Sequence, residues 1–424
     1  MTSRERIVNT LQRKPADRTP IDFGGTGTTG IHAEVYNGIR KLLGIEPAVL
    51  RIPEFMSQLA YIDPEVLDSI GGDVVALWRL SPCMGLPVTG YRESILSDGT
   101  PCLLPEFFLP VSNEKGDLLY FKPRNCKDYV HPYPRGTDPE EYNANKPIAI
   151  CPKGYKSFCR VYHPLTGVET TEELAGFIFP DMDEAELTFL ESEAKRLYET
   201  TDKAVCGIFN GNPFELGQLY WGHEDFFTLL LTESELMEFY FDLRTELLML
   251  DLKKYLERVG KYIQVIQFTE DLGSQTSLLI SPDLYRKAVK PYHRRMFDFV
   301  KNEYPHVKIL LHSCGAVFDL IPDFIEMGVD ALNPVQTTAV GMDPERLKST
   351  YGRDIVFWGG GIDTQGTLSA GTREDNKAYV SKSMSVLAPG GGYIFSQVHN
   401  VEGNVPAENL LEAFRTAQNI RNNY

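Results

Sequence analysis

The feature that most constrains the fold is a repeated alternation between short apolar runs and amphipathic segments. From the third run onward the two alternate strictly, which favours parallel strands joined by helical crossovers. The predicted strands lie near residues 21, 74, 205, 264, 308, 330, 355 and 393. Eight such units in 424 residues predict one α/β domain over 1–424, a (β/α)8 TIM barrel. A doubly wound open sheet is the alternative, because periodicity does not distinguish the two.

The segment 83–165 departs from this pattern. Pro, Gly, Asp and Asn are frequent in it, and Asp98-Gly99 and Lys115-Gly116-Asp117 are typical of hairpin turns. We therefore expect an antiparallel and irregular insertion after the second strand of the barrel. It would act as a lid or an interface, or be a plain surface elaboration.

The apolar run that starts at Val307 ends in His312-Ser313-Cys314-Gly315. Its length and composition are those of a buried parallel strand. Alternate side chains of a strand point to the same face, so His312 and Cys314 are expected to point at one spot. An imidazole and a thiolate that converge in this way form half of a zinc site. The alternative is a buried histidine beside an inert cysteine.

Polar residues follow most of the predicted strands, and in a barrel these carboxyl ends form the rim that carries the chemistry. The catalytic candidates are Glu270, Asp271, Asn333 and Asp363, and the substrate-binding candidates are Asn210, Gln336, Phe209 and Trp358. The two aromatic residues would wall a pocket for a flat, apolar substrate. Each polar candidate is also explained as a helix cap or a turn residue.

A metal site drawn from this rim would consist of His312, Cys314, Glu270 and His399. Nitrogen, sulfur and carboxylate ligands in a four-coordinate site suit Zn²⁺. Asp271 or Asp363 could replace Glu270 or His399. Nucleophilic serine chemistry is not indicated, because the sequence contains no GxSxG elbow.

The composition of the chain disfavours some classes of binding partner. The net charge is −16 and there is no dense Lys/Arg stripe, which disfavours a nucleic-acid partner. No apolar run is long enough to span a bilayer, and the charged start has no signal-peptide core. The seven cysteines are scattered and form no CxxC pair. We expect a cytoplasmic protein with reduced thiols and no membrane partner.

Several motifs together resemble the uroporphyrinogen decarboxylase superfamily. They are Arg4-Glu-Arg-Ile7, Asp17-Arg-Thr-Pro20, Glu270-Asp-Leu-Gly-Ser-Gln275, Ile280-Ser-Pro-Asp-Leu-Tyr-Arg286, Lys290-Pro-Tyr-His293, His312-Ser-Cys-Gly315, Asn333-Pro-Val-Gln336, Gly359-Gly-Gly-Ile-Asp363 and Pro406-Ala-Glu-Asn409. The resemblance covers nearly the whole chain and is tightest from about 262 to 410. It implies a single (β/α)8 barrel, in agreement with the strand count.

The resemblance implies one of two chemistries. Decarboxylases of the superfamily bind a porphyrinogen with an arginine-rich motif after the first strand, but residues 23–32 contain no arginine. The other branch is similar to zinc-dependent, corrinoid-linked methyltransferases, which carry His-x-Cys at this strand end and usually a second cysteine near the eighth strand. Here His312 and Cys314 match, and His399 lies near the position expected for that second cysteine.

This branch implies a zinc methyltransferase that moves a methyl group between a small methylated substrate, such as a methoxylated aromatic, and a corrinoid protein. The chain has no corrinoid-binding module of its own, so a corrinoid-binding partner protein would carry the cobalamin. Three alternatives are a methyl-corrinoid to tetrahydrofolate methyltransferase, a porphyrinogen decarboxylase and a non-catalytic corrinoid-protein binder. A homodimer is compatible with each of them.

Overall fold

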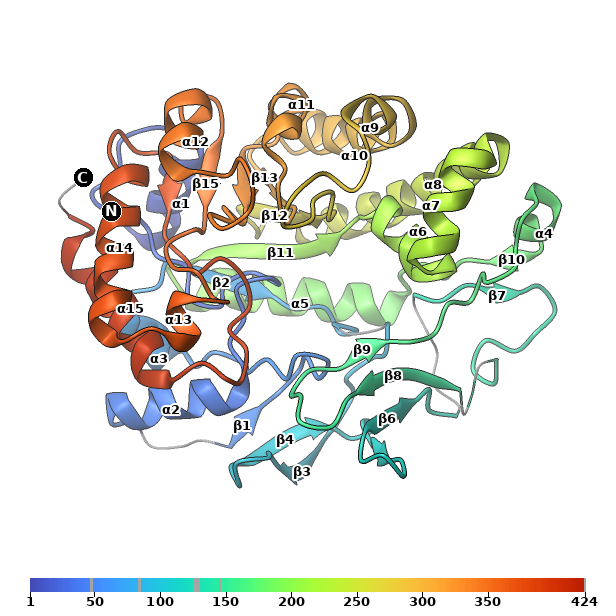
Figure 1. Ribbon diagram of the computed structural model, residues 1–424, viewed down its shortest axis with the longest axis horizontal. Helices are drawn as coiled ribbons and strands as arrows, with labels where there is room; N and C mark the ends of the chain where they lie inside the picture. The colour runs from blue at the N-terminus through green and yellow to red at the C-terminus, as the bar shows by residue number, and fades with distance from the viewer. Residues whose placement is uncertain (46–48, 83–84, 125–129, 143, 145, 423–424) are drawn as a thin grey trace.

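The computed structural model describes residues 1–45, 49–82, 85–124, 130–142, 144 and 146–422. Its centre is an all-parallel sheet of seven strands in the order β16-β15-β14-β13-β12-β11-β2 (Figure 1). The strands are β2 (Val74–Leu77), β11 (Ala204–Asn210), β12 (Val265–Thr269), β13 (Lys308–His312), β14 (Ala331–Asn333), β15 (Val356–Trp358) and β16 (Tyr393–Ile394). Neighbours in the sheet are therefore neighbours in the chain.

The segment around Ile21 closes this sheet into a ring. Ile21 forms a parallel bridge with Phe395, just beyond β16, and the amide of Asp22 donates to the Phe395 carbonyl at 2.8 Å. On its other side, the amide of Asp73 donates to the Ile21 carbonyl at 2.7 Å. The predicted strand near residue 21 thus joins the two edges of the sheet. The predicted (β/α)8 barrel is confirmed, and the open-sheet alternative is wrong.

One apolar cluster fills the inside of the barrel. Strand residues that point inward pack there with Ile7 and Leu11 of α1 (Ser3–Leu11). The strand residues are Val74, Ala204, Cys206, Val265, Leu310, Ala331, Val356, Trp358 and Ile394. The interior is thus a packed core rather than a pore, as expected for this fold. Helix α1 closes the end at which the strands begin.

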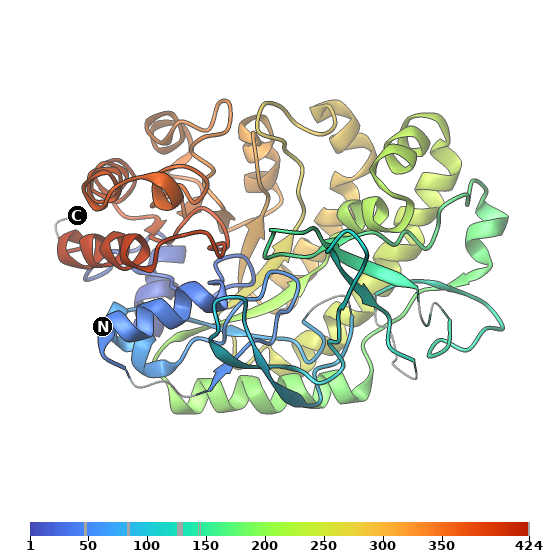
Figure 2. The same cartoon turned by 60° about the horizontal axis from the view of Figure 1, so that its bottom comes forward.

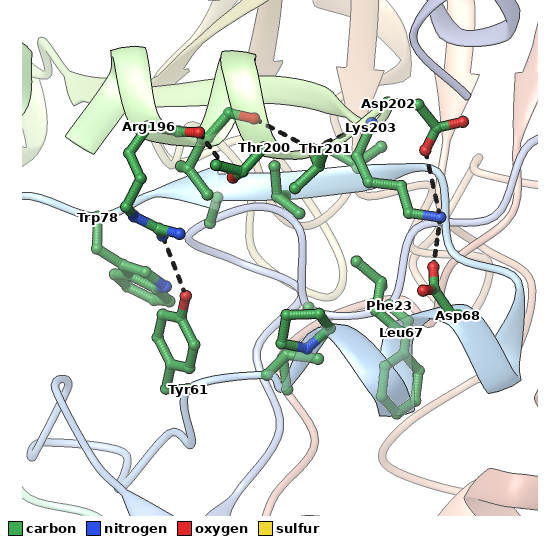
Figure 3. Close-up of a pocket in the computed structure, with 17 residues that line it drawn as sticks. Phe23, Tyr61, Leu67, Asp68, Trp78, Arg196, Thr200, Thr201, Asp202 and Lys203 are labelled. Carbon is green, nitrogen blue, oxygen red and sulfur yellow. Dashed lines mark hydrogen bonds and ion pairs between the residues drawn. The ribbon is translucent and has the colours of Figure 1, made fainter. Parts of the chain in front are cut away.

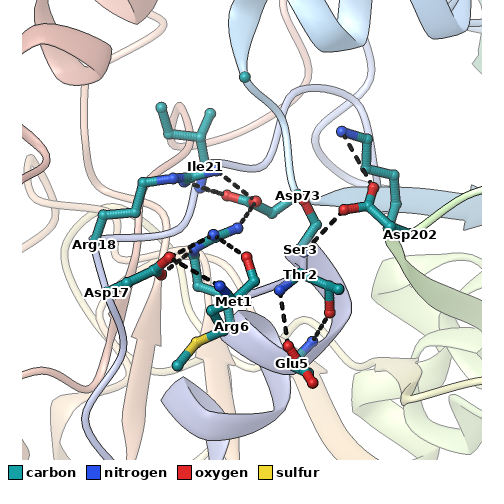
Figure 4. A network of polar contacts seen from close by, with 12 residues as sticks. Met1, Thr2, Ser3, Glu5, Arg6, Asp17, Arg18, Ile21, Asp73 and Asp202 are labelled. Carbon is teal, nitrogen blue, oxygen red and sulfur yellow. Dashed lines mark hydrogen bonds and ion pairs between the residues drawn. The ribbon is translucent and has the colours of Figure 1, made fainter.

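A buried ionic network fastens α1 to the barrel (Figure 4). The carboxylate of Asp73, at the start of β2, accepts hydrogen bonds from Arg6 and Arg18, each at 2.7 Å, and from the amide of Ile21 at 2.9 Å. Arg6 also contacts Asp17 at 2.6 Å. The Asp73 side chain is fully buried, so its charge depends on these arginines.

The helices that follow the strands form the outer layer. They are α2 (Ala33–Leu43), α3 (Pro64–Ile70), α5 (Glu184–Thr200), α6 (Pro213–Trp221), α7 (His223–Thr232), α8 (Ser234–Val259), α9 (Pro282–Ala288), α10 (Lys290–Glu303), α11 (Ile321–Glu326, preceded by a 3₁₀ turn at Phe318–Leu320), α12 (Pro344–Tyr351), α13 (Thr367–Ala370), α14 (Arg373–Leu387) and α15 (Ala407–Ile420). Within the described residues, no helix is long and apolar enough to cross a membrane.

Between β2 and α5 the chain forms short strands in three small sheets, which lie along one side of the barrel (Figures 1 and 2). The strands are β3 (Tyr91–Ile95), β4 (Pro101–Pro105), β5 (Val111–Ser112), β6 (Leu118–Phe121), β7 (Tyr133–Pro134), β8 (Pro147–Cys151), β9 (Cys159–Arg160) and β10 (Phe177–Ile178), with the short helix α4 (Thr171–Ala175) before β10. The strand β1 (Leu50–Arg51) adds to β4 in parallel, whereas the other pairings are antiparallel. The predicted antiparallel insertion is therefore present, while its limits at 83 and 165 and the one-domain division stay a prediction.

The segment between β8 and β9 holds the insertion against the barrel. The ammonium of Lys156 donates to Glu34 of α2 and, at 3.1 Å, to the carbonyl of Gly403. Ser157 donates to Glu402 at 2.8 Å. Glu402 and Gly403 lie in the loop that follows β16, so the insertion contacts the same loop that carries His399.

Candidate metal centre

Three of the four predicted metal ligands meet at the carboxyl ends of the strands. One donor atom from each of His312, Cys314 and His399 lies within 4.8 Å of the other two. His312 Nε2 is 3.3 Å from Cys314 Sγ, and the two imidazole rings lie edge to face with centroids 5.3 Å apart. The structure thus brings together side chains from β13 and from the loop after β16, as the barrel predicts.

Local backbone contacts position the cysteine. Its amide donates to the Asp271 carboxylate at 2.8 Å, and the next amide, that of Gly315, donates to the side-chain oxygen of Gln336 at 2.7 Å. Gly315 has φ +84°, and a Cβ there would lie 2.5 Å from the backbone of Gly273. Only glycine fits this turn, because both the backbone angle and the close approach exclude a side chain.

A hydrogen-bond network orients His312. Its Nδ1–H donates to Asn333 Oδ1 at 2.6 Å, and the amide group of Asn333 donates to the Trp358 carbonyl at 3.0 Å. Because that carbonyl only accepts, the orientation of the Asn333 side chain is determined, and with it the tautomer of His312. Nε2 is left with its lone pair facing Cys314. Outer partners of this kind are typical of metal-binding histidines.

Sequence reasoning missed two residues that extend this network. Thr28 donates to Asn333 Oδ1 at 3.0 Å, and it accepts from Gln267 of β12 at 3.2 Å. Gln267 in turn accepts from the amide of Gly27 at 2.8 Å. Residues 23–32 were noted only for their lack of arginine, so no signal in the sequence singled out Thr28.

The donor atoms fit zinc. A tetrahedral ion bound by one imidazole nitrogen and one thiolate holds these two atoms about 3.5 Å apart, close to the observed separation of 3.3 Å. Burial lowers the pKa of His399 to about 4, which keeps the imidazole in the neutral form that metals require. Burial, followed by Asp271, raises the pKa of the Cys314 thiol, so binding of an ion would displace its proton.

Asp271 borders the cluster. Its carboxylate oxygen, which already accepts from the amide of Cys314, lies 3.8 Å from His312 Nε2. The side chain is 41% exposed, so its second oxygen remains accessible to solvent. Of the two acids that end the fourth barrel strand, Asp271 is the one placed beside the histidine and the cysteine.

Glu270 does not belong to this cluster, contrary to the sequence expectation. Its carboxyl group points to the outer helices, where it accepts from the amides of Phe214 at 3.2 Å and Glu215 at 2.6 Å and contacts His293 Nε2 at 2.7 Å. Burial, followed by the nearby charge of Glu215, raises the pKa of Glu270. The residue caps the N-terminus of α6 instead of facing the barrel mouth.

The other polar candidates divide into two groups. Asn333 orients His312 and Gln336 holds Gly315, so both contact the metal cluster's own residues. Asp363 caps the start of α13, because its carboxylate accepts from the amides of Gln365 and Gly366 at 3.2 and 2.8 Å. Asn210 ends β11 with φ +72° and has no place in the cluster.

Phe209 and Trp358 do not wall the pocket at the barrel mouth, again contrary to expectation. Phe209 packs against Tyr255 and Phe268, with ring centroids 5.6 and 5.5 Å away. Trp358 is fully buried inside the barrel, where its Nε1–H donates to Asp22 at 2.8 Å. Both positions lie on strands that are buried on each face, so the aromatic side chains serve the core.

A pocket of about 330 Å³ opens beside the cluster, and it is formed by the loops after β12 to β16. Its lining includes Gly273, Ser274, Gln275, Cys314, Gly315, Gln336, Thr338, Asp363, Thr364, Gln365, Val398 and His399. Half of these residues carry an amide or hydroxyl side chain. Among the described residues that form it there is no Lys, Arg, Phe, Tyr or Trp.

A larger cavity of about 530 Å³ lies outside the barrel, beside β2, α3 and α5 (Figure 3). Its charged groups are already paired: Lys203 contacts Asp68 at 2.8 Å, and Arg196 binds Glu193. None of the predicted site residues lines it. The smaller pocket, in contrast, shares Cys314 and His399 with the cluster.

Fold and site together define a (β/α)8 barrel with a candidate metal centre at the carboxyl ends of its strands. Residues 160–420, more than half of the chain, match the sequence profile of the uroporphyrinogen decarboxylase (URO-D) family. The chain belongs to that family. The motifs from Glu270 to Asn409 that suggested the family all lie within the matched segment.

The curated relatives are distant. A uroporphyrinogen decarboxylase of Prochlorococcus marinus is 23% identical over 180 residues, which are 40% of this chain and 47% of that protein. The chloroplastic uroporphyrinogen decarboxylase 2 of Arabidopsis thaliana is 24% identical over 169 residues, 38% of this chain and 40% of that protein. The chain thus spans about half or less of the length of the curated relatives that it matches.

A solved structure extends the comparison to the whole chain. A methyltransferase from Methanosarcina mazei superposes with a TM-score of 0.57 and covers 99% of each chain at 14% identity. At this identity the likeness shows that the two proteins share a fold. It includes the insertion side of the barrel, because nearly all of both chains is covered.

Proposed function

We propose that this protein is a zinc-dependent methyltransferase that moves a methyl group between a small methylated substrate and a corrinoid protein. The observation that carries the proposal is the convergence of His312, Cys314 and His399 within 4.8 Å at the barrel mouth. A nitrogen and sulfur donor set of this kind suits Zn²⁺ and leaves a coordination position for substrate. The methyltransferase title of the M. mazei structure supports the same branch.

The chain's own residues would hold and orient the metal. His312, Cys314 and His399 would bind it, and the Asn333 oxygen would keep the Nδ1 proton of His312 away from it. When bound, zinc would supply Lewis acidity toward the leaving group of the methyl donor. Asp271 and Gln336 would fix the turn that carries Cys314 through its two backbone amides.

The corrinoid would come with a separate corrinoid-binding protein, and its cobalt would accept or donate the methyl group over the barrel mouth. We place both proteins in the cytoplasm and allow for a homodimer of this chain. The expected methoxylated aromatic donor loses support, because Phe209 and Trp358 are core residues and not pocket walls.

The first test is metal content. We expect about one zinc per chain in the purified protein and less than a tenth of that in Cys314→Ala, measured by mass spectrometry of the metal. Cys159→Ala is the matched control, because this cysteine is exposed on β9, outside the cluster. Full zinc content in Cys314→Ala, or undiminished methyl transfer to cob(I)alamin after chelation, would contradict the proposal.

Porphyrinogen decarboxylation is the second candidate, because the curated relatives carry that name. It would require cationic partners for several carboxylates. Residues 23–32 contain no arginine, and the mouth pocket of about 330 Å³ is small for a tetrapyrrole. Loss of carboxyl groups from uroporphyrinogen in the presence of the purified protein would favour this candidate. Methyl transfer from methylcobalamin to tetrahydrofolate would instead support the opposite direction of transfer, from the corrinoid to a pterin.

A further inference from the structure

The pocket beside the metal cluster offers unused hydrogen-bonding groups. Gln336 is 8% exposed, and its side-chain oxygen is committed to the amide of Gly315, while its NH₂ group has no partner among the described residues. Thr364 is also 8% exposed and lines the same pocket, and in the described part of the chain its hydroxyl is likewise without a partner. Neither group is shut off from solvent, so both can donate to a ligand that enters the pocket.

The charges of the pocket disfavour an anion. Asp363 lines it and Asp271 borders it, whereas no Lys or Arg is among the described residues of its lining. A carboxylate placed here would lose its hydration without a cationic partner and would also meet two acids. A methoxybenzoate type of donor therefore does not suit this site.

The pocket does not suit a quaternary ammonium compound either. Such cations are recognised by the faces of aromatic rings, but the described lining has no Phe, Tyr or Trp. The oxygens of Asp363 accept from the amides of Gln365 and Gly366 in the turn before α13, so this carboxylate is not a free counter-charge. Amide and hydroxyl groups remain, and these match the ether or hydroxyl oxygen of an uncharged molecule.

We propose that the methyl donor is a small, uncharged, oxygen-bearing compound, a short alcohol or alkyl ether, held by Gln336 and Thr364 beside the metal cluster. The volume of about 330 Å³ lies at the lower end of the range for small-molecule sites. This inference rests on the proposed methyltransferase function and names the substrate class of the same pocket.

The transfer balances with the reduced corrinoid as co-reactant. The methyl C–O bond breaks and its electron pair stays on oxygen, which takes one proton from solvent and leaves as an alcohol or as water. The electron pair of Co(I) forms the new Co–C bond, so that cobalt is formally oxidised to Co(III). Gln336 and Thr364 are positioning groups in this step, because they hold the donor and do not exchange a proton with it.

Binding and turnover are measured separately. Saturation-transfer NMR on the zinc-loaded protein, without corrinoid, uses 2-methoxyethanol, 4-methoxybenzoate and tetramethylammonium as probes. Turnover is followed by the absorbance change of cob(I)alamin to methylcobalamin with methanol, 2-methoxyethanol, 1,2-dimethoxybenzene and 4-methoxybenzoate. We expect 2-methoxyethanol to bind and the two ions not to bind, and kcat/KM for the small donors to exceed that for 4-methoxybenzoate by at least tenfold.

Two variants test the residues. Gln336→Glu keeps the oxygen that holds Gly315 but loses the NH₂ donor, so KM for 2-methoxyethanol should rise about tenfold while kcat and zinc content stay nearly constant. Thr364→Val should raise KM severalfold, whereas Thr232→Val, an exposed threonine at the end of α7, should not. Equal kcat and KM losses, or an unchanged KM in both variants, would overturn the assignment of these residues.

The outcomes separate the two proposals. Preferred turnover of either aryl ether overturns the donor class and leaves the methyltransferase proposal intact. Absence of turnover with every donor, together with absence of transfer from methylcobalamin to tetrahydrofolate, overturns the proposed function. In that case the NMR experiment still decides the character of the pocket, since binding of an ion in preference to 2-methoxyethanol overturns the inference on its own.

Discussion

At the residue scale, hydrogen bonds from neighbouring side chains determine which atom of each candidate ligand faces the site. His312 has two ring nitrogens. Nδ1 is hydrogen-bonded to Asn333 Oδ1 at 2.6 Å, so that only Nε2 faces Cys314. The side chain of Asn333 is itself held by Trp358 on the neighbouring strand β15 and by Thr28 in the loop that follows Ile21. Metal affinity at this site is therefore tied to groups that never touch the metal.

The first prediction concerns Asn333. Asn333→Leu should weaken zinc binding about 10- to 100-fold, because the outer partner of His312 is lost. Asn333→Asp keeps an oxygen for the Nδ1 proton and should retain most of the affinity. Competition with a fluorescent chelator measures both variants. The same loss in Asn333→Asp would show that the amide's contact with Trp358, and not the His312 bond, sustains the site.

The sequence identified the His312 and Cys314 pair because strand geometry relates residues two apart, which is a local rule. Glu270 was assigned wrongly for a non-local reason. Its partners Phe214, Glu215 and His293 come from other elements of the chain, and only the folded barrel determines that the carboxyl group turns toward them. No pattern in one sequence distinguishes such an outward-turned acid from a ligand.

At the scale of elements, the end of β12 joins two outer helices. Glu270 caps α6 through two backbone amides and contacts His293 of α10, while Tyr285 of α9 contacts His293 Nδ1 at 3.1 Å. Burial raises the pKa of Glu270 and lowers that of His293 to about 3, so the imidazole is uncharged near neutral pH. The helix layer is thus fixed to the strand that also presents Asp271.

The second prediction is a pH dependence of stability from His293. In the unfolded chain its pKa is near 6.5, and in the folded protein it is about 3. Between these values only the unfolded state takes up the proton, so the stabilising effect is complete above pH 6.5 and is lost as the pH falls toward 3. The raised pKa of Glu270 acts in the opposite sense, so a variant is needed to isolate the histidine.

His293→Phe removes this titration. The free energy of unfolding of the wild type should fall by about 2–3 kcal/mol relative to the variant between pH 6.5 and 4.5. Urea unfolding at several pH values measures the difference, and His223→Phe on the exposed start of α7 is the control. Parallel pH profiles of the wild type and His293→Phe would contradict the assignment.

Elements with long periodic patterns were predicted well, and short or interrupted ones were not. The crossover between the strands near 264 and 308, which the alternation predicts as helical, divides at Val289 into α9 and α10. Helices α3 and α6 each begin at a proline and are short, so in the sequence they resemble loops. The seven strands of the barrel sheet and the closing segment at Ile21 were all found, because apolar runs buried on both faces are a strong signal.

At the scale of the whole molecule, stability and chemistry occupy opposite ends of the barrel. The network of Arg6, Arg18 and Asp73 closes the end where the strands begin, and the metal cluster lies where they finish. In (β/α)8 barrels the carboxyl-terminal end of the strands usually carries the activity and the opposite end contributes stability. It allows the two ends to be tested independently.

The third prediction concerns the closed end. Asp73→Asn leaves Arg18 without its charge partner and Arg6 with Asp17 alone, and should cost about 3–5 kcal/mol of stability, measured by urea unfolding. Zinc content per folded molecule should not change. Asp17→Asn, at a side chain 42% exposed, should cost less than about 1 kcal/mol. Equal losses in the two variants would show that burial of Asp73 is not what makes its pairing important.

The fourth prediction concerns the insertion. Lys156→Ala removes the contacts to Glu34 and Gly403, so the segment between β8 and β9 should exchange its amide hydrogens faster while the barrel strands do not. Hydrogen-exchange mass spectrometry measures this, with Lys253→Ala on the outer helix α8 as control. Unchanged exchange rates in Lys156→Ala would show that contacts other than those of Lys156 hold the insertion against the barrel.

The absence of Lys and Arg from the described lining of the mouth pocket also has a kinetic consequence. Without a Lys or Arg in the described lining, capture of an uncharged donor is not steered by an electric field, and its association rate should be indifferent to ionic strength. A protein partner meets a chain of net charge −16, so its encounter rate depends on salt over a Debye length of about 8 Å at physiological ionic strength. Salt would therefore change how often the partner arrives without changing how fast the donor is loaded.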